Sequence, residues 1–277
     1  MNFLHTFTPN SVLISFGPFT IYFYGFFIVC GILLGSTIVL KLAEKYHIEK
    51  NTIIDMAFWV IIVSIAGGRL YHIFLELPYY LEHPLQTVMI WRGGLAIHGA
   101  IIAGFFTTYF LAKKNQVNPI QLLAMFAPAL ALGQALGRWG NYFNQELFGL
   151  PTNLPWGIPI EYQKRVAGFE FYEYFHTTFL YESIGSVFIV IFLLYLHRVF
   201  IKNKIDKYEI IVAFYLLLYS ILRFSLEFVR IDKTPELLGL RFPQIASIIL
   251  AIISLYVIFK NKKTLCSLIK TKERKNA

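Results

Sequence analysis

The sequence predicts an all-α integral membrane protein with about seven transmembrane helices and a small cap on the outer side. Of its 277 residues, 57% are hydrophobic and only 15% are charged, whereas a soluble domain carries about a quarter charged residues. Several apolar stretches approach the roughly 20 residues with which a helix spans a bilayer. The connections are too short to bury a core of their own, so we expect residues 1–277 to form a single transmembrane domain.

Seven apolar segments can be drawn along the chain. They run approximately over Ile21–Leu40, Met56–Leu75, Leu95–Ala112, Ile120–Leu136, Phe179–Ile201, Ile210–Leu226 and Ile245–Phe259. The first contains Gly31 and Gly35, a G-x-x-x-G spacing that is typical of close helix packing. The longest connection, residues 138–178, is rich in Pro, Gly and aromatic residues, and we therefore expect it to form the outer cap.

Lysine and arginine are distributed unevenly between the two ends of the predicted helices. Connections after the first, third, fifth and seventh segments hold most of them, including the basic tail at residues 260–277. Cytoplasmic loops carry such an excess, so we expect the N-terminus outside, the C-terminus in the cytoplasm and the tail near anionic lipid. This bias accounts for the net charge of +9 without nucleic acid as a partner.

Cysteine and histidine spacing argues against metal or redox chemistry. Cys30 and Cys266 are the two cysteines, too few and too far apart for a disulfide framework, and neither C-x-x-C nor H-E-x-x-H occurs. We therefore expect no metal and no organic cofactor. The start of the chain lacks Lys and Arg before the first apolar run, which is unlike a cleaved signal peptide.

Polar residues crowd into the stretch Gly137–Gly149, GRWGNYFNQELFG, directly after the fourth apolar segment. If the helix continues from Arg138, Asn141 and Gln145 fall on its face at i+3 and i+7. Polar groups at membrane depth are costly, so such a stripe is expected to face a cavity or a ligand. The alternative is an interfacial cap with glycine turns, because Trp and Arg are ordinary membrane anchors.

Two further stretches could contact an anion. In WRGGLAIHGA, Gly93 and Gly94 leave a helix start uncrowded, and its free N–H groups favour a phosphate. His98 lies one turn further and can exchange protons with a thiol near neutral pH, although a packing role is the alternative. Arg69, inside the second segment, is expected to pair with an acid in the bundle.

The sixth segment ends in LRFSLEFVR, which places Arg223, Glu227 and Arg230 on one helical face. Two arginines and one glutamate leave a surplus positive charge. A phosphate would neutralise it through forked hydrogen bonds. A purely structural ion-pair cluster is the alternative.

These stretches resemble the motifs of the prolipoprotein diacylglyceryl transferase family. GRWGNYFNQELFG looks like G-R-x-G-N-F-x-N-x-E-x-x-G and departs only at Tyr142, while RFSLEFVR is similar to R-F-x-x-E-F-x-R at every fixed position. GGLAIHGA resembles G-G-x-x-x-H-G-G, with Ala100 in place of the last glycine. HTTFLYE, which ends at Glu182, matches H-P-S-Q-L-Y-E in part.

The resemblance implies an enzyme of the bacterial inner membrane that carries out the first step of lipoprotein maturation. Its substrates would be phosphatidylglycerol and preprolipoprotein signal peptides with a lipobox cysteine. The diacylglyceryl group would pass to the cysteine thiol, a thioether would form, and glycerol phosphate would leave. Both substrates would reach the site sideways through the membrane lipid.

The resemblance and the residues together suggest roles at the site. His98 is the candidate base, with Tyr24 near enough to orient a partner, and Arg138 and Arg223 would stabilise charge on the leaving phosphate. Arg230 would mainly hold the headgroup. Further residues expected to bind phosphatidylglycerol are Asn141, Asn144, Glu146, Gly149, Glu227, Gly93 and Gly94, with Glu182 in an outer position only. We expect His98 and the arginines to converge on one lipid phosphate near the outer leaflet.

Two other classes of protein fit parts of the pattern. A lipid or solute transporter would explain intramembrane Arg and Glu as gating pairs, but the chain shows no repeated halves with matching broken helices. A non-catalytic membrane scaffold would leave the outward-facing basic residues unexplained.

Overall fold

The computed structural model describes residues 3–17 and 19–265. Within these residues lie seven long helices, and the predicted all-α membrane fold is confirmed. They are α2 (Phe23–Lys45), α3 (Lys50–Leu75), α5 (Ile97–Lys114), α6 (Pro119–Asn144), α7 (Thr178–Lys202), α8 (Glu209–Glu227) and α9 (Phe242–Lys260). The end of the predicted basic tail, with Cys266, lies outside the described residues.

Six of these helices, among the residues that the structure describes, are long and apolar enough to cross a membrane. The helix outside this set is α5, which carries His98, Lys113 and Lys114 within its 18 residues. The predicted number of seven spans is therefore approximate, although each predicted segment is helical.

Short elements connect the long helices. The helical ones are α1 (Phe3–Thr6), α4 (Leu77–Glu82), η1 (Pro84–Val88), η2 (Ile90–Arg92) and η3 (Tyr162–Lys164). The strands form three antiparallel pairs, β1 (Val12–Phe16) with β2 (Phe19–Tyr22), β3 (Ile158–Pro159) with β4 (Tyr174–Phe175), and β5 (Glu236–Leu237) with β6 (Leu240–Arg241).

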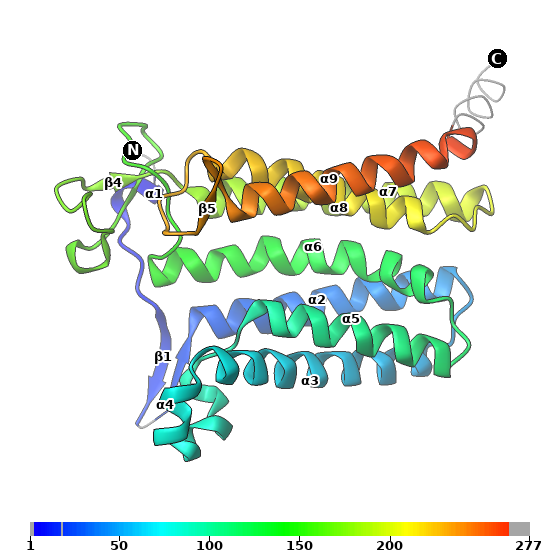
Figure 1. The fold of residues 1–277 in the computed structure, drawn as a ribbon, viewed down its shortest axis with the longest axis horizontal. Helices are drawn as coiled ribbons and strands as arrows, with labels where there is room; N and C mark the ends of the chain where they lie inside the picture. Colours follow the sequence, from blue (N-terminus) through cyan, green and yellow to red (C-terminus); the bar gives the residue numbers. More distant parts are fainter. Residues whose placement is uncertain (1–2, 18, 266–277) are drawn as a thin grey trace. The chain divides into compact units, whose positions relative to one another are not determined.

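The chain divides into two compact units. One comprises the residues up to 38 and those from 126 onward, and the other comprises residues 39–125. In the second unit α3 packs along α5 (Figure 1). The contact is close because a Cβ on Gly67 of α3 would lie 2.3 Å from the Ala103 Cβ and 2.9 Å from the Gly99 carbonyl oxygen.

In the first unit α8 packs against both α7 and α9 (Figure 1). The predicted close packing at the G-x-x-x-G spacing of α2 is confirmed, and its partner is α6. A Cβ on Gly31 would lie 3.3 Å from the Gly133 Cα, and a Cβ on Gly35 would lie 3.3 Å from the Ala129 Cβ. Small residues on both helices allow this approach.

The connection between α6 and α7 packs with the ends of both helices around one apolar cluster. Strands β3 and β4 pair within the connection, and the buried members of the cluster are Tyr142, Phe148, Ile158, Ile160, Phe175 and Phe179. Tyr142 belongs to α6 and Phe179 to α7, so the cluster joins the predicted cap segment to these helices. Its place on the outer side of a membrane stays a prediction.

Helix α6 is longer than the sequence predicted, because it continues past Leu136 to Asn144. Arg138 and Asn141 therefore share a helical face, as expected. Gln145 does not belong to this stripe. It lies beyond the helix with a φ of 54°, and its side-chain nitrogen donates to the Pro9 carbonyl at 2.8 Å and to Glu161 at 2.9 Å. The expected stripe was wrong at Gln145 because the helix ends there in a turn, in which the N–H groups of Gln145 and Glu146 donate to the Tyr142 and Asn141 carbonyls, both at 3.0 Å.

Candidate functional site

A cluster of arginines surrounds Glu182, which lies near the start of α7. Its carboxylate pairs with Arg138 of α6, with Arg223 of α8 at 3.1 Å and with Arg230 at 3.0 Å. Only 5% of the Glu182 side chain is exposed. A buried carboxylate needs charged partners of this kind, and here one carboxylate brings together arginines from separate parts of the chain.

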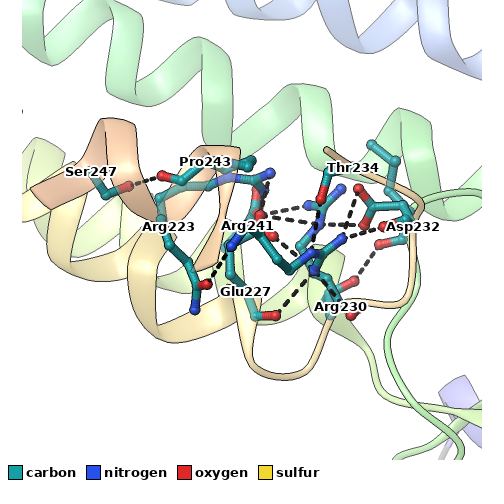
Figure 2. Close-up of polar contacts among 12 residues, drawn as sticks. Arg223, Glu227, Arg230, Asp232, Thr234, Arg241, Pro243 and Ser247 are labelled. Atoms are coloured by element: carbon teal, nitrogen blue, oxygen red, sulfur yellow. Dashed lines mark hydrogen bonds and ion pairs between the residues drawn. The ribbon is translucent and has the colours of Figure 1, made fainter. Parts of the chain in front are cut away.

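Glu227, the last residue of α8, is the second carboxylate of the cluster, and its side chain is fully buried. One oxygen lies 2.5 Å from Arg223 Nη2 and the other lies 2.8 Å from Arg241 Nη1. Figure 2 shows Glu227 between these arginines and Arg230. Arg230 is more distant, at 3.8 Å. Glu227 is therefore shared mainly between Arg223 and Arg241.

Asp232 is the third carboxylate and lies in the loop after α8. It accepts a hydrogen bond of 2.7 Å from Arg230 Nε and lies 3.6 Å from Arg241 Nη2. Burial alone would raise the pKa of the Asp232 carboxyl. The hydrogen bond from Arg230 and the charges of Arg230 and Arg241 outweigh burial, and the pKa lies below its ordinary value. Asp232 is therefore ionised at neutral pH.

Among the described residues, the ion pairs of the cluster join four arginines to three carboxylates, which leaves one positive charge in excess within these pairs. Glu146 is linked to Arg138 only through Asn141 and is not counted among them. Exposure differs sharply among the arginines. The Arg230 side chain is 3% exposed, while Arg223 is 15% and Arg138 is 20% exposed. An added anion would therefore reach Arg138 and Arg223 more readily than Arg230. A small recess beside the cluster is lined by Arg138, Asn141, Leu147, Thr178, Phe179, Glu182 and Arg230.

An amide network extends from Arg138 along the end of α6. Arg138 Nη1 donates to the Asn141 side-chain oxygen at 3.2 Å, and the Asn141 side-chain nitrogen donates to Glu146 at 2.7 Å. Asn144 also donates to Glu146, at 3.3 Å. These contacts hold the Arg138 guanidinium in place.

The remaining predicted site residues of the first unit are Tyr24, which packs on α6, and Gly149, which pairs with Arg230. A Cβ on Gly140 would lie 2.6 Å from a ring carbon of Tyr24, so Tyr24 packs directly on the end of α6. Gly149 forms an antiparallel bridge with Arg230. A Cβ on Gly149 would lie 2.8 Å from the His176 Cβ, and this close approach requires glycine.

Tyr142, the departure from the family pattern in this stretch, points into the apolar cluster of the cap. Its ring stacks on Phe179 with centroids 4.4 Å apart and meets Trp139 edge-on. Its hydroxyl is buried and has no hydrogen-bond partner among the described residues. The substitution therefore changes the packing of the cap rather than the arginine cluster.

The other predicted site residues, His98, Gly93 and Gly94, belong to the second unit. His98 is the second residue of α5 and is exposed, with its ring 6.1 Å from that of Tyr71. Gly93 and Gly94 precede the helix with φ values of 88° and 74°, a region that favours glycine. Their carbonyl oxygens accept hydrogen bonds from Arg69 at 2.7 and 2.9 Å.

The expected pairing of Arg69 with an acid was wrong. Its guanidinium binds main-chain carbonyls of Gln86, Thr87, Gly93 and Gly94. The Gln86 and Thr87 carbonyls belong to η1, and those of Gly93 and Gly94 lie in the segment before α5. Arg69 thus fixes the loop that leads into α5.

Sequence reasoning missed parts of the cluster. Arg241 and Asp232 were not singled out, and Glu182 was given an outer position although it lies at the centre. Asp232 is close in sequence to Arg230, which was an available signal. Arg241 offered none, because only the β5–β6 hairpin brings it back to the end of α8.

Glu182→Gln should destabilise the protein strongly. The change leaves three guanidinium groups facing one another without the buried charge between them, and breaking a buried ion pair costs about 3–5 kcal/mol. Thermal unfolding in detergent measures this. Glu44→Gln is the matched control, because Glu44 and Lys50 form an exposed pair at 2.9 Å and exposed pairs contribute little. Equal melting temperatures for the two variants would contradict a central role for Glu182.

Comparison with known proteins shows the family of the chain. Residues 11–260 match the profile of the family described as prolipoprotein diacylglyceryl transferase. Proteins named phosphatidylglycerol–prolipoprotein diacylglyceryl transferase are similar along most of the chain. The relative from Synechococcus elongatus is 39% identical over 87% of this chain and 84% of its own. The one from Finegoldia magna is 39% identical over 92% and 96%, and the one from Gloeobacter violaceus 35% over 82% and 83%. The family profile, these similarities and the membrane-length helices show that the chain belongs to the prolipoprotein diacylglyceryl transferase family of membrane enzymes.

Proposed function

We propose that this protein transfers the diacylglyceryl group of phosphatidylglycerol to the lipobox cysteine of preprolipoproteins in the bacterial inner membrane. Its relatives carry the name of this activity. The observation that carries the proposal is the arginine cluster with one unbalanced positive charge. A lipid phosphate supplies the negative charge that this cluster lacks, and guanidinium groups bind phosphate through paired hydrogen bonds.

In the proposed reaction the cysteine thiolate attacks the carbon of the diacylglyceryl group that is bonded to the phosphate oxygen. The sulfur–carbon bond forms, the carbon–oxygen bond breaks, and glycerol phosphate leaves with the electron pair of that bond. Negative charge grows on the phosphate oxygens as the bond breaks. Arg138 and Arg223 are the more exposed arginines of the pairs around Glu182, which supports their assignment to this charge.

The other residues of the cluster would bind the lipid or hold the arginines. Arg230 is almost fully buried and paired with Glu182 and Asp232, so it would act on the headgroup mainly through the charge that it brings. Glu227 orients Arg223 at 2.5 Å. The glycerol hydroxyls of the headgroup would bind near Asn144, Glu146 and the main chain of Gly149. Asn141 and Tyr24 would support these residues.

His98 is the proposed base. A cysteine thiol has a pKa of about 8.5 and reacts as the thiolate, and histidine accepts a proton near neutral pH. In the same unit, the first N–H groups of α5, which begins at Ile97, would favour a nearby anion. Gly93 and Gly94 precede this helix start, and the Gly93 N–H already donates to the Ile90 carbonyl at 3.1 Å. The lipid carries its own leaving group, so the proposal requires neither a metal nor an organic cofactor.

The proposal includes the orientation predicted from the basic residues, with the N-terminus outside and the C-terminus in the cytoplasm. The cap and the cluster would then lie at the outer side, where signal peptides and phosphatidylglycerol arrive through the lipid. A reporter enzyme fused after Lys260 shows on which side of the membrane the C-terminal end lies, and we expect the cytoplasmic side.

Transfer can be measured directly with the purified protein. Phosphatidylglycerol vesicles and a lipobox peptide should give a peptide whose mass increases by one diacylglyceryl group. A peptide with serine in place of the lipobox cysteine should stay unmodified. Folded protein that yields no product under these conditions would reject the proposal, and uptake of a solute by the vesicles would favour a transporter.

Arg138→Lys should lower the transfer rate at least about tenfold, which is roughly 1.4 kcal/mol in the barrier. Lysine keeps the charge but loses the planar fork that binds two oxygens at once. Steady-state kinetics with the lipobox peptide measure the change. Arg165→Lys is the matched control. Among the described residues, the hydrogen-bond partners of the Arg165 side chain are the main-chain carbonyls of Ile160 and Glu170. Near-normal turnover of Arg138→Lys would remove Arg138 from the phosphate.

His98→Gln should slow transfer most near neutral pH and leave binding of phosphatidylglycerol unchanged. Glutamine cannot accept the thiol proton, so the deficit should shrink as rising pH ionises the thiol itself. The pH–rate profile, with lipid binding measured in parallel, checks this. His83→Gln, a change at an exposed histidine of the same unit, is the control. A His98→Gln profile parallel to that of the wild type would assign the base to another group.

A further inference from the structure

Arg241 makes the widest set of contacts in the cluster, although it lies outside the matched motifs. Besides its ion pair with the Glu227 carboxylate, its guanidinium donates hydrogen bonds to the main-chain carbonyls of Glu227 and Arg230, both at 3.1 Å, and to that of Asp232. Its Nε donates to the Thr234 hydroxyl at 2.9 Å. Figure 2 shows Arg241 reaching the loop from the start of α9. The Arg241 side chain thus holds several residues of the loop between α8 and α9 together.

The β5–β6 hairpin determines where Arg241 lies. Leu238 and Gly239 form its two-residue turn with φ values of 54° and 76°, the positive values that a tight hairpin requires. Arg241 pairs with Glu236 in the hairpin, and its main-chain N–H donates to the Gln244 side chain at 3.0 Å. The start of α9 is therefore held in register with the end of α8.

The contact that matters for the site is with Glu227. Arg223 binds one oxygen of this carboxylate and Arg241 binds the other. Without Arg241, the second oxygen would be buried and would lack its partner at 2.8 Å. The nearest means of satisfying it is a forked pair with Arg223, because arginine and carboxylate favour two parallel hydrogen bonds. Arg223 would then be drawn toward Glu227 and away from Glu182.

Arg241 also provides the surplus charge. With it, four arginines face three carboxylates, and without it three face three. A neutral cluster would attract an anionic lipid much less, because charge interactions are strong where water is excluded. Arg241 thus affects both the position of Arg223 and the net charge of the cluster.

We propose that Arg241 is a positioning residue for the lipid phosphate, which acts by occupying Glu227 so that Arg223 and one net positive charge remain available to the phosphate. The inference rests on the proposed function. It adds a residue that does not itself touch the reacting atoms, and it assigns the specificity for an anionic headgroup to the balance of charges in the cluster.

The first test compares two variants, one without the charge of Arg241 and one that keeps it. Arg241→Gln removes the charge but keeps an amide donor for the loop carbonyls, while Arg241→Lys keeps the charge. Arg241→Gln should raise KM for phosphatidylglycerol about tenfold or more. The kcat should fall as well, because Arg223, which is assigned to the charge on the leaving phosphate, would be drawn toward Glu227. Arg241→Lys should stay within about threefold of the wild type, because it keeps the positive charge in the cluster. Equal losses in both variants, or an unchanged KM in Arg241→Gln, would overturn the inference.

The second test separates charge from structural support. Asp232→Asn in the Arg241→Gln background restores the surplus of one positive charge while it weakens a further contact of the loop. If charge balance is decisive, the double variant should recover a large part of the lost affinity. A purely structural role for Arg241 predicts a further loss instead, and that result would reject the inference.

Controls distinguish the possible failures. Arg165→Gln removes an arginine that also binds loop carbonyls, and its KM should match that of the wild type. If the wild-type protein shows no transfer, the proposed function fails. If the wild type transfers and Arg241→Gln is normal, only this inference fails. Should the variants at 241 not fold, Asp232→Asn alone raises the surplus to two charges and should lower KM, and a raised KM would contradict the inference.

Discussion

The cluster depends on the Glu182 carboxylate, which binds arginines from α6, from α8 and from the loop after α8. Three guanidinium groups this close would repel one another strongly in a site with little water. One buried carboxylate turns that repulsion into attraction. In doing so it ties the end of α6 to the start of α7 and the end of α8, which are the helix ends at the candidate site.

The cluster has a buried part and a more open part. Glu227 and Arg230 have almost no exposed surface, whereas Arg138 and Arg223 retain some. A buried charged pair adds little to stability compared with an apolar pair of the same size, so its value lies in the geometry that it imposes. Arginine suits this role because it stays ionised at any ordinary pH and binds through a rigid fork. The proposed phosphate would thus meet charges already held in position.

Arginines also organise the connecting loops. Arg69 binds four main-chain carbonyls before α5, Arg165 binds two in the cap, and Arg241 binds three between α8 and α9. Loop carbonyls lack the partners that a helix or sheet provides, and leaving them unpaired is costly where water is scarce. A guanidinium with five N–H groups satisfies several at once. Both units therefore hold their helix ends by the same physical means.

The sequence by itself determined the all-α membrane fold, the places of the helices and the residue types of the site. Apolar runs of membrane length and helical spacing are local properties, so Arg223 and Glu227 could be placed on one face from their positions alone. Only the tertiary structure decided that Glu182 is the centre, that Gln145 leaves the helix and that Arg241 completes the cluster. These outcomes depend on which distant groups satisfy a buried charge or carbonyl, and spacing along a chain carries no record of that choice.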